Sequence, residues 1–134
     1  MFSITKEIHF CYGHRLMNHP GKCRHLHGHS ATAAITIEAE QLNPHGMVYD
    51  FSEIKEVAAS FIHQHFDHNM LLHQDDPICS ALDEAGERFM TLDVHPTAEN
   101  LAKMIYTHFK ELDYPVRKVA LWETTGAYAE YRDS

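Results

Sequence analysis

The N-terminal segment alternates between apolar and polar positions. Its apolar positions include Phe2, Ile4, Ile8 and Phe10. This period of two predicts a half-buried strand over residues 2–12. A second strand is predicted over residues 31–42, because an apolar run there ends at the turn-forming sequence of residues 43–46. The polar segment between them, residues 13–30, keeps neither a strand nor a helix period, which predicts a long loop.

Two later segments have the spacing of amphipathic helices. The first begins at Ser52 and ends near Phe66, with apolar residues recurring every three or four positions. The second opens at Pro96 and is closed by the Asp-Tyr-Pro sequence of residues 113–115. Between the two helices, residues 88–94 alternate in the manner of a short strand.

The C-terminal segment predicts two more strands, over residues 116–125 and 127–132, which are separated by Gly126. This order of elements predicts an α+β fold in which an antiparallel sheet carries two helices on one face. The length suits one core, so we expect a single domain over residues 1–134. The uncovered face of such a sheet would be partly apolar, which predicts an oligomer.

Composition narrows the class of protein. Apolar residues make up 44% and charged residues 22% of the chain, as in ordinary globular domains. No run approaches the roughly 20 apolar residues of a membrane span, and no signal-peptide pattern opens the chain, so we expect a cytoplasmic protein that binds no membrane. The net charge of -8 argues against nucleic-acid partners. A polyphosphate substrate would need a local basic group such as Arg15, Lys22 and Arg24.

The thirteen histidines prompt a search for a metal site, because neutral imidazole is a common zinc ligand. His27 and His29 lie two residues apart around Gly28, so in an extended segment both point to the same side. His14 follows the first strand, and pairing of the first two strands would bring it beside them. Three histidines leave one tetrahedral position open, as in catalytic zinc sites. His25, which alternates with His27, is the alternative ligand.

Other segments supply candidates for proton transfer and ligand binding. Cys23 could act as a ligand, nucleophile or base, and we favour the base because three histidines already supply ligands. Asp67 and His68 follow the first helix and could form a dyad, or Asp67 could only cap that helix. Glu123 is a carboxylate in an otherwise apolar strand, where it would bind an amino-heterocyclic edge or simply face outward.

Six short motifs occur in one order along the whole chain. They are residues 10–14 (Phe-Cys-Tyr-Gly-His), 23–29 (Cys-Arg-His-Leu-His-Gly-His), 48–51 (Val-Tyr-Asp-Phe), 66–69 (Phe-Asp-His-Asn), 96–100 (Pro-Thr-Ala-Glu-Asn) and 122–124 (Trp-Glu-Thr). Together they resemble the 6-pyruvoyl-tetrahydropterin synthase and 6-carboxy-tetrahydropterin synthase family. The chain departs from the family pattern at Tyr12 and Gly13, where small residues are more usual, and in residues 71–95, a segment longer than in many relatives.

The resemblance implies the tunnelling fold (T-fold), in which sheets of several subunits join into a barrel, commonly as a homo-hexamer with active sites between subunits. The zinc ligands that it implies are His14, His27 and His29. The other site residues that it implies are Cys23 as general base, Asp67 and His68 as a proton relay, Glu123 as the anchor of the pterin's amino edge, and Thr97 near the pterin.

The spacing Cys-x-x-x-His-Gly-His is similar to that of the carboxy-forming branch, which serves queuosine precursor synthesis. The resemblance therefore implies a zinc-dependent lyase that converts 7,8-dihydroneopterin triphosphate to 6-carboxy-5,6,7,8-tetrahydropterin, acetaldehyde and triphosphate. One alternative is the pyruvoyl-forming reaction, which keeps the carbon skeleton of the side chain. The other is a non-catalytic module that binds zinc or a pterin.

Overall fold

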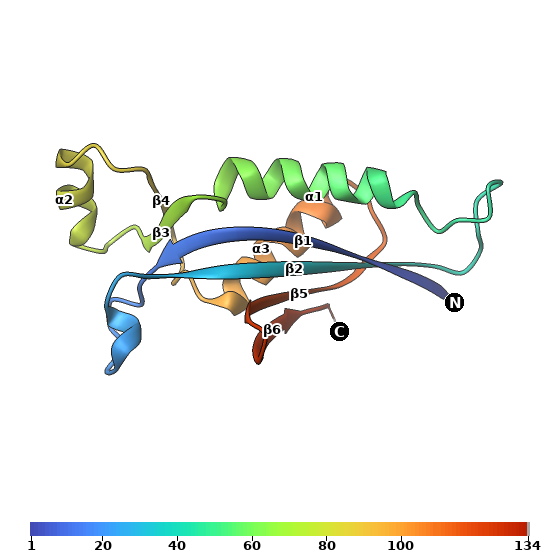
Figure 1. Ribbon diagram of the computed structural model, residues 1–134. Coiled ribbons are helices and arrows are strands. Elements are labelled where there is room, and N and C mark those ends of the chain that lie inside the picture. Colours follow the sequence, from blue (N-terminus) through green and yellow to red (C-terminus); the bar gives the residue numbers. More distant parts are fainter. Residues whose placement is uncertain (134) are drawn as a thin grey trace.

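A long antiparallel hairpin forms the centre of the fold in the computed structural model, which describes residues 1–133. Strand β1 (Phe2–His14) pairs with β2 (His27–Ala39) along its whole length. β5 (Val116–Thr124) pairs antiparallel with β2, and β6 (Ala127–Tyr131) pairs antiparallel with β5. These four strands lie side by side (Figure 1). The two predicted C-terminal strands are thus confirmed.

The sheet is mixed, so the prediction of a wholly antiparallel sheet was wrong. β3 (Asn69–His73) runs parallel to β1, and β4 (Phe89–Leu92) runs parallel to β3. The strand order is β4-β3-β1-β2-β5-β6. β3 was missed because five residues that are partly buried on both sides show no clear period of two. The short strand expected over residues 88–94 is confirmed as β4.

Two long helices cover one face of the sheet (Figure 1). They are α1 (Phe51–His65) and α3 (Ala98–Glu111). The side chain of Asp50 caps the start of α1 by accepting a hydrogen bond from the Ser52 amide. A third, unpredicted helix, α2 (Ile78–Glu84), lies at the end of the molecule. It escaped prediction because seven residues span too few turns to show an apolar stripe.

The core lies between the sheet and these two helices. Its sheet side includes Ile8, Phe10 and Tyr12 of β1, Ala33, Ile35 and Ile37 of β2, and Val119 and Leu121 of β5. Its helix side includes Ile54, Ala58 and Ile62 of α1, and Leu101, Ile105 and Phe109 of α3. Side chains alternate along a strand, so the inward face of β1 continues to His14, which is also buried. One end of the core is therefore polar.

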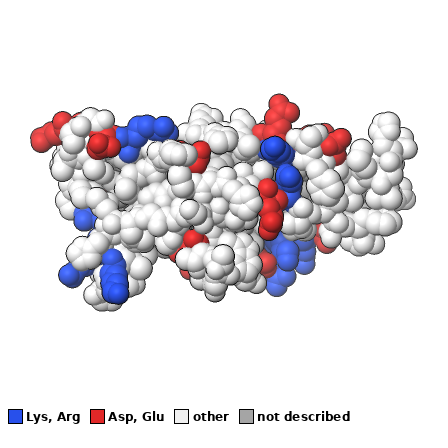
Figure 2. Space-filling model, in the orientation of Figure 1, with Lys and Arg blue, Asp and Glu red and all other residues white. Residues whose placement is uncertain are grey.

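The strands extend further into residues 13–30 than the sequence predicted, which shortens the loop to residues 15–26. Gly13 and Gly28 are paired across the end of the hairpin. They allow the backbones of β1 and β2 to approach closely and do not mark a turn. A Cβ at position 28 would lie 3.2 Å from the carbonyl oxygen of Tyr12. The loop contains a 3-10 turn, η1 (Lys22–Arg24), whose basic side chains lie at the tip of the molecule (Figure 2).

None of the helices in residues 1–133 is both long and apolar enough to cross a membrane.

Candidate active site

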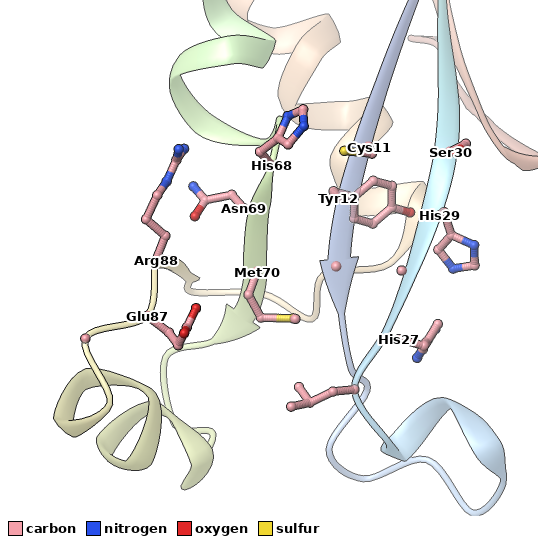
Figure 3. Close-up of a pocket in the computed structure, with 14 residues that line it drawn as sticks. Cys11, Tyr12, His27, His29, Ser30, His68, Asn69, Met70, Glu87 and Arg88 are labelled. Carbon is pink, nitrogen blue, oxygen red and sulfur yellow. The ribbon is translucent and has the colours of Figure 1, made fainter.

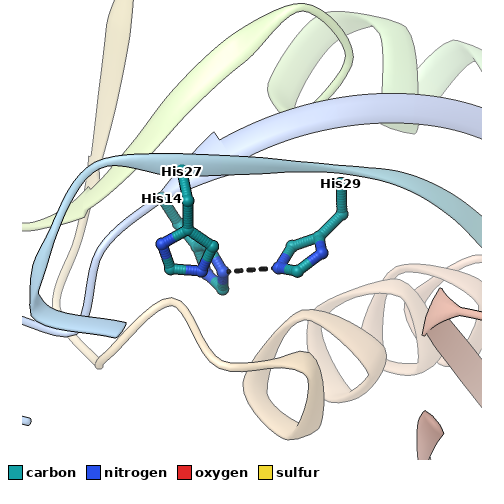
Figure 4. Close-up of side chains that lie close together, drawn as sticks. All are labelled: His14, His27 and His29. Atoms are coloured by element: carbon teal, nitrogen blue, oxygen red, sulfur yellow. Dashed lines mark hydrogen bonds between the residues drawn. The ribbon is translucent and has the colours of Figure 1, made fainter. Parts of the chain in front are cut away.

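Three histidines converge at the end of the central hairpin. His14, the last residue of β1, pairs with His27, the first residue of β2, and His29 follows two residues later on the same side. Their ligand nitrogens lie within 4.8 Å of one another, and the rings point toward a common centre (Figure 4). The Nε2 atoms of His14 and His29 are 3.2 Å apart. The pairing predicted from the sequence therefore does bring these three residues together.

Backbone carbonyls fix the orientation of two of these rings. Nδ1 of His14 lies 2.7 Å from the carbonyl oxygen of Pro96, and Nδ1 of His27 lies 2.7 Å from that of His25. A carbonyl can only accept, so each Nδ1 donates the hydrogen bond, and Nε2 is the ring nitrogen left to serve as a ligand. His25 thus contributes its backbone, and its ring lies outside the group of potential ligands.

Burial keeps His14 neutral. It lowers the pKa of this imidazole below its usual value, and the hydrogen bond to the Pro96 carbonyl offsets this only in part. A neutral imidazole that donates its second N–H to a carbonyl is the usual arrangement of a zinc-ligating histidine. The tri-histidine cluster, meaning His14, His27 and His29, therefore fits a zinc ion.

A cavity of about 560 Å³ opens beside the tri-histidine cluster. Its wall brings together most of the site residues predicted from the sequence: His14, Cys23, His27, His29, Thr97 and Glu123. These residues come from β1, the 15–26 loop, β2, the start of α3 and β5. The cavity is thus built where these five segments meet.

Cys23 is half-buried in η1, within the loop that joins β1 to β2. Its carbonyl oxygen accepts a hydrogen bond of 2.8 Å from the amide of Leu16, which closes the loop on itself. The neighbouring Arg15 binds the buried carboxylate of Asp76 through both Nε and Nη2. The Arg15 guanidinium is therefore held in an ion pair with Asp76. It is not available, as the sequence suggested, to bind a polyphosphate together with Lys22 and Arg24.

Glu123 faces the cavity, and the alternative of a plain outward-facing side chain was wrong. Its Oε1 accepts a hydrogen bond of 3.0 Å from the hydroxyl of Tyr12, and its Oε2 lies 3.6 Å from Nε2 of His29. Burial, together with the charge and hydrogen bond of Glu123, raises the pKa of Tyr12, so the phenol stays protonated and donates. Sequence reasoning missed Tyr12, although its place two residues before His14 put it on the same face.

Thr97 lies in the cavity wall at the start of α3. Its Oγ1 accepts a hydrogen bond of 3.2 Å from the amide of Asn100, which caps the helix. The preceding Pro96 holds His14, so the start of α3 supports the tri-histidine cluster directly.

Asp67 and His68 form a dyad, but the chain does not bring it to the tri-histidine cluster. Oδ2 of Asp67 lies 3.1 Å from Nδ1 of His68 and 3.1 Å from Nδ1 of His63. Oδ1 of Asp67 accepts a hydrogen bond of 3.1 Å from the amide of Cys11. Burial raises the pKa of Asp67, but this hydrogen bond and the two imidazoles outweigh it, so the net shift is downward. Asp67 is thus an ionised partner of His68 and more than a helix cap.

Comparison with known proteins then identifies the family. The profile of the 6-pyruvoyl tetrahydropterin synthase family matches residues 3–134. The chain belongs to this family. The 6-carboxy-5,6,7,8-tetrahydropterin synthase of Rickettsia felis is 37% identical over 97% of this chain and 99% of its own length. The enzyme of the same name from Haemophilus influenzae is 29% identical over 99% of this chain and 100% of its own length.

Solved structures confirm the T-fold expected for a 6-pyruvoyl tetrahydropterin synthase family member. An uncharacterized protein from Wolinella succinogenes superposes with a TM-score of 0.83 at 24% identity, over 99% of this chain and 98% of that one. The 6-pyruvoyl tetrahydropterin synthase of Caenorhabditis elegans superposes with a TM-score of 0.73 at 21% identity, over 99% and 96%. The chain is therefore a tetrahydropterin synthase family protein with this fold.

Proposed function

We propose that this chain is a zinc-dependent 6-carboxy-5,6,7,8-tetrahydropterin synthase. It would convert 7,8-dihydroneopterin triphosphate to 6-carboxytetrahydropterin, acetaldehyde and triphosphate. The observation that carries the proposal is the convergence of three imidazoles on a cavity that also holds Cys23 and Glu123. The names of relatives that are 36–37% identical over nearly the whole chain support this choice of product.

His14, His27 and His29 are the proposed zinc ligands. Zinc binds imidazole nitrogen at about 2.0–2.1 Å, so the three ligand atoms need only a small inward movement from their present separations. When bound, the ion supplies a Lewis acid toward the side-chain hydroxyls of the substrate. Three protein ligands leave a coordination position for such a hydroxyl.

Cys23 is the proposed general base, which removes a proton from the substrate's side chain. It lies in the wall of the same cavity as the three imidazoles. Nearby positive charge favours a thiolate, so a filled zinc site would favour the deprotonated form of Cys23, the form that can accept a proton. The backbone hydrogen bond from Leu16 keeps the residue at this wall.

Glu123 is the proposed anchor of the pterin. Its carboxylate can accept two N–H groups from the amino edge of the heterocycle, and the Tyr12 hydroxyl holds the carboxylate in place. We place Thr97 near the pterin because it lines the same cavity. Lys22 and Arg24 in η1 are the basic residues that we assign to the triphosphate.

Asp67 and His68 would return a proton to the substrate in the active site of a neighbouring subunit. Within one chain the dyad adjoins Cys11, on the face of β1 opposite to His14, whereas the imidazole of His68 is 73% exposed. The open sheet edges, β4 and β6, are available for pairing between subunits. We therefore propose a homo-oligomer, with a barrel and a hexamer as the expected form, acting in the cytoplasm in queuosine precursor synthesis.

Product analysis tests this function. Zinc-loaded protein is incubated with 7,8-dihydroneopterin triphosphate, and the products are identified by mass spectrometry. We expect 6-carboxytetrahydropterin and acetaldehyde in equal amounts. A pyruvoyl product without acetaldehyde would instead assign the pyruvoyl-forming reaction, and binding of zinc and substrate without any product would leave a non-catalytic module.

A further inference from the structure

A second group of potential metal ligands lies on the outer face of β1. Ligand atoms of Cys11, Asp67 and His68 lie within 4.8 Å of one another. Because side chains alternate along a strand, Cys11 faces away from the side that carries Tyr12 and His14. We propose that Cys11, Asp67 and His68 bind a thiophilic divalent cation such as zinc or cadmium, at a site separate from the tri-histidine cluster.

Backbone contacts hold the three residues together. The amide of His68 donates a hydrogen bond of 2.8 Å to the carbonyl oxygen of Cys11, and the amide of Cys11 donates one of 3.1 Å to Oδ1 of Asp67. His68 has a φ of 55°, a left-handed conformation that is uncommon for a residue other than glycine. The strand and the turn after α1 are therefore joined through the proposed ligands themselves. Their proximity does not depend on surface side-chain rotamers alone.

The chemistry of the three ligands matches a thiophilic dication. A thiolate, a carboxylate and an imidazole are all zinc ligands, and the first two together neutralise a charge of two. Binding replaces the thiol proton: the S–H bond of Cys11 breaks, a sulfur–metal bond forms, and the proton passes to solvent. Ligand atoms around one zinc lie about 3.3–3.7 Å apart, so no pair of ligand atoms needs to close by more than about 1.5 Å. The 73% exposed side chain of His68 is free to make that movement.

The surroundings leave room for the ion. Cys11 and His68 line a cavity of about 810 Å³, whose wall also includes His27 and His29 (Figure 3). Arg88 donates to the backbone carbonyl oxygen of Asp67, at 3.5 Å, whereas the partners of the carboxylate are the Cys11 amide, His63 and His68. Asn69, in the same cavity wall, has the one buried side-chain oxygen in residues 1–133 that lacks a hydrogen-bond partner. That oxygen is an acceptor suited to a water molecule on the ion.

Occupation of this site would inhibit the enzyme, a consequence that rests on the proposed function. An ion bound to Asp67 and His68 removes the lone pair and the charge that a proton relay needs. Metal in excess of the tri-histidine cluster would then stop turnover. Binding itself does not depend on the reaction.

Metal stoichiometry tests the site. The protein is dialysed against rising zinc, and bound metal is measured by inductively coupled plasma mass spectrometry. We expect two zinc ions per chain for the wild type and the control Cys79→Ser, and one for Cys11→Ser. His14→Ala should keep only the second ion. One ion in the saturated wild type, or two in Cys11→Ser, would overturn the proposal.

Cadmium identifies the ligand directly. Thiolate–cadmium bonds have a charge-transfer band in the ultraviolet. The second equivalent of cadmium should produce this band in the wild type and in Cys23→Ser, but not in Cys11→Ser. Should Cys11→Ser keep the band of the second equivalent, Cys11 is not a ligand. Cys11→Ala serves as a second variant if the serine protein is poorly folded.

Activity separates this site from the proposed function. Excess zinc should lower wild-type turnover by about a hundredfold or more, because a general acid–base group typically contributes that much. Cys11→Ser should keep its turnover under the same conditions. Equal inhibition of both proteins would contradict the inhibitory role. A wild type that is inactive with one zinc would instead contradict the proposed reaction, while the stoichiometry would still decide the second site.

Discussion

Arg15 and Asp76 form a two-pronged ion pair that joins the loop carrying Cys23 to the turn before α2. Nε of Arg15 lies 2.7 Å from Oδ2 of Asp76, and Nη2 contacts Oδ1. The Asp76 side chain is fully buried and also accepts a hydrogen bond of 2.9 Å from the Ile78 amide. The unpredicted α2 segment is thus tied to the residue that follows His14, a proposed zinc ligand.

Removal of this carboxylate should destabilise the protein. Asp76→Ala leaves the Arg15 guanidinium without its partner, and breaking a buried ion pair typically costs about 3–5 kcal/mol. Urea unfolding followed by circular dichroism measures the free energy of unfolding. The matched control is Asp75→Ala, whose side chain is 76% exposed, and we expect a change within about 0.5 kcal/mol. Equal losses in the two variants would contradict a special role for the pair.

The ion pair of Arg15 and Asp76 should also make the free energy of unfolding depend on pH in the acidic range. Burial raises the pKa of Asp76, but the hydrogen bond and charge of Arg15 and the Ile78 amide outweigh it, so the pKa is lower in the folded than in the unfolded state. The contribution is therefore complete above the unfolded value of about 3.9 and is lost as the pH falls through the folded value. Urea unfolding at neutral pH and near pH 3 should show the gap between wild type and Asp76→Ala narrowing in acid. A gap that stays constant would contradict this.

Zinc binding should depend on His14 but not on the ring of His25. His14→Ala removes one of three ligands, whereas His25 serves His27 through its backbone carbonyl, which alanine retains. At low free zinc, metal analysis should find the cluster occupied in the wild type and in His25→Ala, and empty in His14→Ala. Loss of this zinc in His25→Ala would show that the ring is a ligand after all.

Turnover should depend on Cys23. Cys23→Ala is expected to lower kcat by about a hundred- to ten-thousandfold, because the general base is lost, while zinc remains bound. Cys79→Ala is the control, since Cys79 lies on α2 and outside the cavity of the tri-histidine cluster. Steady-state rates and metal analysis check both variants. A Cys23→Ala protein with near-normal kcat would end the role of Cys23 as base.

The convergence of His14, His27 and His29 was predictable because it is local to one hairpin. His27 and His29 share a face by alternation, and the pairing of adjacent strands brings His14 opposite His27. The parallel strands β3 and β4 were harder, because parallel pairing depends on long-range contacts that no local period records. The inward position of Glu123 depends on the pairing of β5 with β2. For the same reason its contact with Tyr12 could not be read from the sequence.

The two faces of the central hairpin carry different parts of the proposed chemistry. The inner face holds the three proposed zinc ligands, whereas the dyad adjoins Cys11 on the outer face. If each active site combines the inner face of one chain with the dyad of another, two inactive variants can complement each other. Mixed assemblies of Cys23→Ala and His68→Ala chains would then regain activity that neither variant has alone. A chain dissociated from its partners would be folded but catalytically inactive.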